Sequence, residues 1–142
     1  MIALLDTNII VDVLQARAPW NKAGEEIFLK AADNSFLGCM TAKSVTDIYY
    51  LCHRMLHSDS ETRRLIAKLL QLFQVLDTAE IDVQKALASD ITDYEDAVMI
   101  ETALRSECEC IVTRNLKDYA KSPVPVYNPE QFLALLAASG QS

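Results

Sequence analysis

The residues of this 142-residue chain that are best suited to chemistry are aspartates, and two of them share one helical pattern. Asp93 and Asp96 stand three residues apart, and at about 100° per residue they lie on the same side of a helix as Ile100. A carboxylate on the apolar side of a helix is costly unless it is paired or binds a cation. Asp93 is also explained as a first-turn acid that suits the helix dipole, but Asp96 lies further into the helix. The pair therefore indicates a carboxylate site near the start of this helix.

Three further aspartates lie near the ends of predicted strands. Asp6 directly follows the apolar run 1–5, and Asp118 follows a second run at 108–113. Because ligands bind beyond the carboxyl ends of the strands in parallel α/β sheets, we expect both residues at one edge of the sheet. Asp47 belongs to a predicted helix that begins just after another strand end, one position off the apolar stripe. Taken singly, Asp6 is also explained as a turn or helix cap, and Asp47 as a surface acid.

Together these acids predict a metal site made of Asp6, Asp47, Asp93, Asp96 and Asp118. A cluster of carboxylates without a histidine ligand is a hard, all-oxygen site, which suits Mg²⁺ or Mn²⁺ better than zinc or copper. Two such ions can activate a water and stabilise the leaving oxygen of a phosphodiester. We therefore expect one or two Mg²⁺ or Mn²⁺ ions as cofactors.

Short apolar runs alternate with longer amphipathic segments along the chain. Strands are predicted at 1–5, 35–40, 74–76, 108–113 and near 126. Helices are predicted at 8–15, 20–32, 43–57, from 58 through 73, through 83 and 87, at 93–106 and from 129, with capping boxes at 58–61 and 92–95. This alternation indicates an α/β fold, a three-layer α/β/α sandwich with a short central, mainly parallel sheet.

Composition narrows the class of protein. The length suits one domain spanning 1–142, and a hydrophobic content of 51% argues against disorder. No apolar stretch is long enough to cross a membrane and no secretory signal is visible, so we expect a cytoplasmic protein. The four cysteines form no C-x-x-C pair and are expected to be buried free thiols. A net charge of −7 disfavours bulk binding of nucleic acid, yet bound cations would reverse the local sign at an acidic site.

Four segments, taken in order, resemble a known family. They are Leu4-Leu5-Asp6-Thr7-Asn8, the stretch 44–50 around Asp47, Asp93-Tyr94-Glu95-Asp96-Ala97, and Val112-Thr113-Arg114-Asn115 with Asp118-Tyr119. No single segment is specific, but their order and spacing in a chain of this length are. The chain resembles a PIN-domain ribonuclease over nearly its whole length, in particular the small single-domain bacterial type that includes VapC-like toxins.

The resemblance implies a PIN-like fold and metal-dependent hydrolysis of RNA by an endoribonuclease, with a metal-activated water as the nucleophile. On the matching positions, Asp6, Asp47 and Asp96 take the place of the catalytic, metal-binding acids, and Asp93 that of an additional acid found in some relatives. Residues that match or neighbour the polar groups orienting these carboxylates are Thr7, Asn8, Thr113 and Asn115. The resemblance also implies an antitoxin protein as a partner, and a homodimer.

Two departures from the family pattern concern the metal ligands. The family usually has glutamate where this chain has Asp47, and Asn115 replaces the aspartate of a common T-R-D triplet. A ligand charge is therefore missing unless Asp118 supplies it, and we expect a weaker second metal site. Arg114 and Lys117 lie beside these residues at a predicted strand end, which indicates contacts to RNA phosphates.

Two other functions stay open on the sequence alone. The departures at 47 and 115 are compatible with a PIN-like scaffold or protein-interaction module that has lost catalysis. A phosphatase with an aspartyl nucleophile after the first strand would generally carry D-x-D, and Asn8 stands at the third position instead. The phosphatase is therefore disfavoured.

Overall fold

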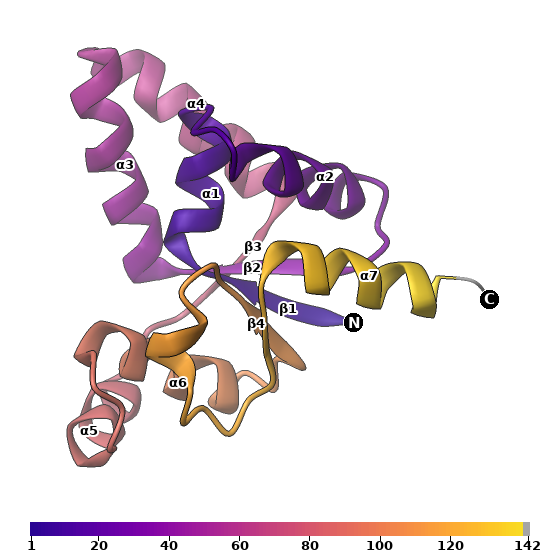
Figure 1. Cartoon of the computed structure of the whole chain (residues 1–142). Coiled ribbons are helices and arrows are strands. Elements are labelled where there is room, and N and C mark those ends of the chain that lie inside the picture. Colours follow the sequence, from indigo (N-terminus) through magenta and orange to yellow (C-terminus); the bar gives the residue numbers. More distant parts are fainter. Residues whose placement is uncertain (141–142) are drawn as a thin grey trace.

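The structure, a computed structural model, describes residues 1–140 and shows helices on both faces of a short sheet (Figure 1). The strands are β1 Ile2–Leu5, β2 Leu37–Thr41, β3 Gln74–Leu76, β4 Cys110–Val112 and β5 Val126–Tyr127. The helices are α1 Thr7–Leu14, α2 Asn21–Ala32, α3 Ala42–Leu56, α4 Asp59–Leu72, α5 Glu80–Ala88, α6 Tyr94–Arg105 and α7 Pro129–Ser139, with a short 3-10 helix η1 Leu116–Tyr119.

The five strands form one sheet in the order β3-β2-β1-β4-β5, and every neighbouring pair is parallel. β1 is central, and Leu4 pairs with Cys39 of β2 on one side and with Ile111 of β4 on the other. The carboxyl ends of these strands therefore meet at one edge. The residues that follow them, including Asp6 and Thr113, are brought close together although they are far apart in sequence.

Side chains along β1 alternate between two hydrophobic cores. Ala3 and Leu5 pack into the larger core, whereas Leu4 packs into the smaller one. The larger core lies under α1, α2, α3, α4 and α7, and the smaller one lies under α6, on which α5 packs in turn (Figure 1). The predicted three-layer α/β/α sandwich is thereby confirmed.

Two local predictions need correction. Thr92 was expected to cap the helix at 93–106, but the cap is Asp93, whose side chain accepts the Asp96 N–H at 3.0 Å. Aspartate caps a helix as well as threonine does, and helical geometry begins only at Tyr94. The strand predicted at 108–113 is limited to β4, because the Cys108 N–H bonds the Ala103 carbonyl and so completes the end of α6.

Two expectations from composition can be compared with the described residues. The four cysteines, Cys39, Cys52, Cys108 and Cys110, are buried and free, as predicted. None of the helices within residues 1–140 has both the length and the apolar character needed to span a membrane.

Candidate active site

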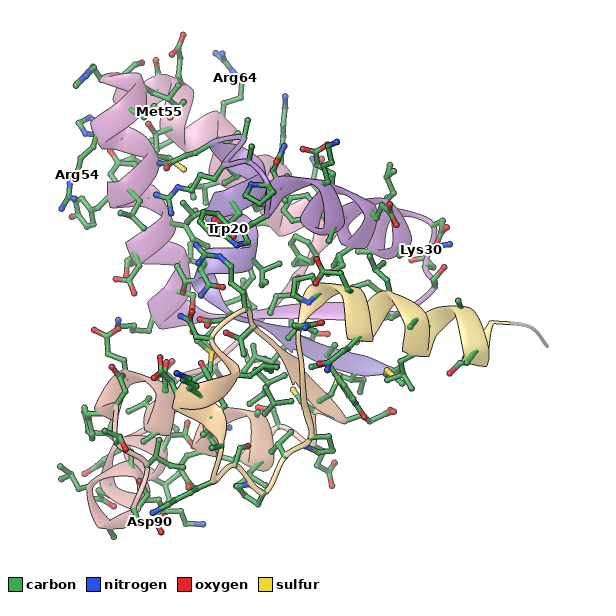
Figure 2. All side chains as sticks on the ribbon, viewed as in Figure 1. Trp20, Lys30, Arg54, Met55, Arg64 and Asp90 are labelled. Atoms are coloured by element: carbon green, nitrogen blue, oxygen red, sulfur yellow. The ribbon has the colours of Figure 1, made fainter. Side chains whose placement is uncertain are left out.

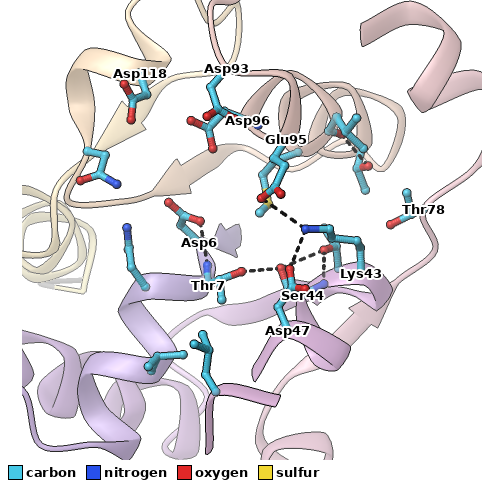
Figure 3. Close-up of a pocket in the computed structure, with 18 of the residues that line it drawn as sticks. Asp6, Thr7, Lys43, Ser44, Asp47, Thr78, Asp93, Glu95, Asp96 and Asp118 are labelled. Carbon is cyan, nitrogen blue, oxygen red and sulfur yellow. Dashed lines mark hydrogen bonds and ion pairs between the residues drawn. The ribbon is translucent and has the colours of Figure 1, made fainter. Parts of the chain in front are cut away.

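A cavity of about 700 Å³ opens at the carboxyl edge of the sheet, between α3 and the beginning of α6 (Figure 3). It is lined by residues at or just beyond the ends of four strands, namely Asp6, Thr41, Thr78 and Asn115. All five predicted metal ligands also line it. The structure thus brings together, in one hollow, acids that are spread over 112 positions of the sequence, from Asp6 to Asp118.

Asp6 is the most tightly held of these acids, with only 8% of its surface exposed. Its backbone N–H donates to the Val112 carbonyl, which extends the pairing of β1 with β4 by one residue. One carboxylate oxygen caps α1 by accepting the Thr7 N–H at 2.8 Å, and the other accepts the Thr113 hydroxyl at 2.7 Å. Burial raises the pKa of Asp6 above its usual value, while these two hydrogen bonds oppose the rise. Asp6 is therefore both a helix cap and a site acid.

Asp96 has the most perturbed electrostatics in the cavity. Burial raises the pKa of its carboxyl to about 7, and the negative charges of Asp6, Asp93 and Asp118 add to the rise. A hydrogen bond from the Tyr119 hydroxyl, at 3.1 Å, acts in the opposite direction. No basic side chain within residues 1–140 forms an ion pair with Asp96. The half-buried carboxyl therefore lacks a compensating cation.

Asp93 and Asp118 complete the acidic end of the cavity from its rim. Asp93 is exposed and caps α6, so it lies at the start of this helix as a cap rather than as the first-turn acid that the sequence suggested. Asp118 lies exposed in η1, which begins just after Asn115. Both carboxylates add to the raised pKa of Asp96, so their charges act on this residue.

Asp47 lies on the α3 side of the cavity and is already paired. The Lys43 ammonium lies 2.7 Å from the Asp47 carboxylate and 3.3 Å from that of Glu95, which belongs to α6 (Figure 3). Lys43 thus bridges the two walls of the cavity. Asp118 is among the main causes of the raised pKa of both Asp6 and Asp96, whereas Asp47 is not. Asp47 thus differs from Asp96 in having a basic partner of its own.

A chain of hydroxyl groups supports the site beneath the carboxylates. The Thr7 hydroxyl lies 2.9 Å from the Ser44 hydroxyl, which in turn accepts the Thr41 hydroxyl at 3.0 Å. Thr41 also caps α3 by accepting the Ser44 N–H. Thr7 was predicted as an orienting residue, but Thr41 and Ser44 were not, although a threonine between a strand and a helix is a recognisable cap signal.

The other polar groups near the carboxylates differ in whether their side chains are hydrogen-bonded. Thr113 holds both Asp6 and the Asn115 N–H, as expected for an orienting residue. The side-chain oxygen of Asn8 is buried at the cavity without a hydrogen-bond partner among the described residues. Tyr119 was missed as a site residue, because nothing in its sequence context marks a phenol that reaches back to Asp96.

The two residues predicted to contact RNA phosphates do not line the cavity. Arg114 donates to the buried carboxylate of Asp12 at 2.6 and 3.1 Å, and its guanidinium lies 4.2 Å from the ring centroid of Trp20. Lys117 is exposed on η1. The basic residues that do line the cavity are Arg17, Lys43 and Arg54.

The donor set fits a hard divalent cation at the acidic end. Within residues 1–140, no three acidic, histidine or cysteine side chains are arranged as a ready-made metal site. Mg²⁺, however, is commonly held by only one or two carboxylates, together with waters and substrate phosphates. Asp6 and Asp96 meet this requirement, because Asp96 has no compensating cation of its own.

The sequence pattern of the family described as PIN domain matches residues 3–117. The chain belongs to the PIN-domain family. The resemblance found in the sequence is therefore confirmed, and the matched range of this PIN domain contains four of the five predicted metal ligands. Among proteins with curated descriptions, none is significantly similar to the chain.

Solved structures share the fold of this PIN domain. A toxin–antitoxin complex from Klebsiella pneumoniae contains a chain that is 21% identical, with a TM-score of 0.66, over 89% of this chain and 97% of that one. A chain of FitAcB from Neisseria gonorrhoeae is 23% identical, with a TM-score of 0.66, over 92% of this chain and 99% of that one. A chain of DNA-bound VapBC from Salmonella typhimurium is 17% identical, with a TM-score of 0.68, over 91% of this chain and 98% of that one.

Proposed function

We propose that this PIN domain is a metal-dependent endoribonuclease. The observation that carries the proposal is the state of Asp96, a half-buried carboxyl whose pKa is raised to about 7 among three other acids and no cation. Protein stability alone gives no reason to gather uncompensated negative charge in a cavity, since like charges destabilise the fold. Perturbed acids in a cleft are instead typical of functional sites.

Asp6 and Asp96 would hold the cation, with Asp93 and Asp118 increasing the negative potential around it. When bound, such an ion supplies an activated water and stabilises charge on the phosphate oxygens. Thr7 and Thr113 keep the Asp6 carboxylate in place through hydrogen bonds to both of its oxygens. The Tyr119 hydroxyl orients Asp96 in the same way.

Asp47 has a more distant role in this proposal. Because Lys43 already neutralises it, a second cation near Asp47 would have to compete with the ammonium group. We therefore expect one tight metal site at Asp6 and Asp96 and a weak second site, in line with the shorter side chain at position 47. A magnesium titration of activity that showed two equally tight sites would contradict this.

The proposal is tested first by thermal unfolding with and without millimolar Mn²⁺. A ligand that binds only the folded state raises the melting temperature, so Mn²⁺ should stabilise the wild type. Asp96→Asn should lose this stabilisation, whereas Glu101→Gln on the same helix should keep it. If Mn²⁺ leaves the wild type unchanged, the domain is better explained as a PIN-like scaffold without catalysis. Cleavage of RNA in Mg²⁺ and its loss in EDTA then test the activity itself.

We also propose that the chain is the toxin of a toxin–antitoxin pair. The support is that structures similar over 95–98% of their own length include a toxin–antitoxin complex and VapBC and FitAB complexes bound to DNA. Co-expression with the product of a neighbouring gene, followed by copurification, tests this. Growth inhibition by the chain when it is expressed alone, together with relief of that inhibition by the neighbouring gene product, would agree with the toxin proposal.

Homodimer formation is the remaining part of the proposal. Large apolar side chains are exposed on α5 and α6, including Leu87 at 74%, Ile81 at 43% and Leu104 at 42%. Contiguous exposed apolar surface is typical of contact regions between proteins. Sedimentation equilibrium of the wild type and of Leu87→Lys measures whether α5 takes part.

A further inference from the structure

One side of α3 forms a stripe along the cavity that reaches beyond the acidic end. Lys43, Asp47, Tyr50, Leu51 and Arg54 all line the cavity. Their spacing of four, three, one and three residues is that of a single helix face. At 1.5 Å per residue the stripe is about 16 Å long, so it extends well past a single phosphate group.

The far half of this stripe has a different chemistry from the near half. Lys43 and Asp47 neutralise each other beside the acids. Tyr50 is 65% exposed although it is a large aromatic residue, and Arg54 is exposed and forms no ion pair with any described residue. Figure 2 shows Arg54 extending from α3 into solvent. The α3 stripe therefore offers an aromatic ring followed, one helical turn later, by a free cation.

The Tyr50 ring contacts one neighbouring ring, which is itself fixed. The ring of Tyr49 packs against it edge-to-face, with centroids 5.2 Å apart. Tyr49 is itself fixed by a hydrogen bond from its hydroxyl to Asp59 and by stacking on His53. A preorganised aromatic side chain loses little conformational entropy when a flat ligand stacks on it.

We propose that Tyr50 and Arg54 form a binding subsite for unpaired RNA nucleotides next to the scissile bond. This inference rests on the proposed ribonuclease function, and it adds the substrate class. A base stacks on Tyr50, and the guanidinium of Arg54 contacts the phosphate of a nucleotide further along. Bases are available for stacking on aromatic side chains where RNA is single-stranded, in loops, bulges and ends. A fully paired helix cannot present a base to Tyr50.

Tyr94 supplies a second ring from the opposite side of the cavity. It begins α6, lines the same cavity and is 43% exposed, and its hydroxyl donates to the Val83 carbonyl at 3.0 Å. Its neighbours in sequence are Asp93 and Glu95, so the ring lies at the border of the acidic end. Rings on both walls favour nucleotides, because each exposed ring can stack on a base.

The test measures the binding of a fluorescent single-stranded oligoribonucleotide of eight residues to the full chain in EDTA, where cleavage is prevented. Tyr50→Leu keeps an apolar side chain and removes the ring, and it should weaken binding fivefold or more. Tyr50→Phe keeps the ring and should bind within about twofold of the wild type. A matched duplex should bind more weakly than the single strand, and Tyr50→Leu should not change its binding.

Several results would overturn the inference. It fails if the wild type binds no single strand at low salt, or if Tyr50→Leu binds as well as Tyr50→Phe. If Tyr50→Leu binds as well as Tyr50→Phe, contact with a protein partner would be the better explanation of the exposed ring. If RNA is cleaved in Mg²⁺ but kcat/KM is the same for Tyr50→Leu and wild type, the subsite is wrong and the ribonuclease proposal stands. If Tyr50 controls binding but no RNA is cleaved, the ribonuclease proposal fails, and Tyr50 and Arg54 remain only as a binding site for unpaired RNA with no scissile bond beside it.

Discussion

Asp96→Asn should make the metal-free protein more stable, although the same change should abolish metal binding. The pKa of Asp96 is raised from 3.8 to about 7 in the folded state. A group whose pKa is raised by folding contributes stability below its unfolded pKa and loses that contribution as pH rises toward its folded pKa. The wild type should therefore become less stable between pH 4 and pH 7. Asparagine has no proton to lose, and its side-chain oxygen can still accept the Tyr119 hydroxyl.

The magnitude follows from the same pKa values. Each tenfold change in proton affinity corresponds to about 1.4 kcal/mol, so without solvent screening the ionised Asp96 would lower the free energy of unfolding of the wild type by about 4 kcal/mol above pH 7. Asp96 is only half-buried, and solvent screening reduces this to about 1–3 kcal/mol. In a domain of this size the variant should then melt roughly 3–10 °C higher than the wild type at pH 8. At pH 5 Asp96 is protonated in the folded state but mostly ionised in the unfolded state, so only about a third of this difference should be present.

Thermal unfolding in EDTA at pH 5 and pH 8, followed by circular dichroism, measures this difference. Glu101→Gln serves as the control, because it removes a carboxylate from the same helix at a group outside the acidic cluster. The control should show no gain between the two pH values. If Asp96→Asn gains no stability relative to the wild type on going from pH 5 to pH 8, the carboxyl is not electrostatically strained. The main support for a metal site would then be lost.

Two further predictions concern buried carboxylates and salt dependence. Arg105→Ala should destabilise the fold by about 2–4 kcal/mol in urea titrations at pH 7, because it leaves Asp82, which is 1% exposed, without its ion pair. Burial raises the pKa of Asp82, but the hydrogen bonds and charge of Arg105 outweigh it, and the pKa ends below its usual value of 3.8. The stability that this ion pair contributes is therefore present above pH 3.8 and is lost as pH falls below it. Equal losses of stability in Arg105→Ala at pH 3 and pH 7 would contradict the assignment. Arg54→Ala should reduce the salt slope of single-stranded RNA binding by about 0.7, whereas Arg114→Ala, whose guanidinium is held by Asp12, should leave it unchanged. A reduced slope for Arg114→Ala would restore this residue as a phosphate contact.

Much of the fold could be predicted because its signals are local. The apolar run of β1 ends at Asp6, and a parallel sheet places the ends of its strands at one edge, so the strand pattern alone predicted that Asp6 lies at the edge where the cavity opens. Helical periodicity similarly placed Asp96 on an inward face. These predictions needed only the spacing of residues within one element.

Contacts between distant parts of the chain could not be predicted in this way. Asp12 and Arg114 are 102 positions apart, and their ion pair diverts a basic residue that stands beside the site in sequence. Tyr119 reaches Asp96 only because η1 folds back over α6. Periodicity describes which side of a helix a residue occupies, but it does not say which other element covers that side.

Asp47 shows that a local signal can be visible and still be ambiguous. Lys43 and Asp47 are four residues apart, a spacing that favours ion pairs along a helix, and the same spacing leaves Asp47 facing the cavity as a metal ligand would. Sequence spacing cannot choose between these two roles, since both need a carboxylate on that face. The structure adds that Glu95 of α6 approaches the same ammonium from the other wall. Two carboxylates around one lysine hold it in place more strongly than one would. We therefore expect any second cation site near Asp47 to be weak because of Lys43 as well as because aspartate is short.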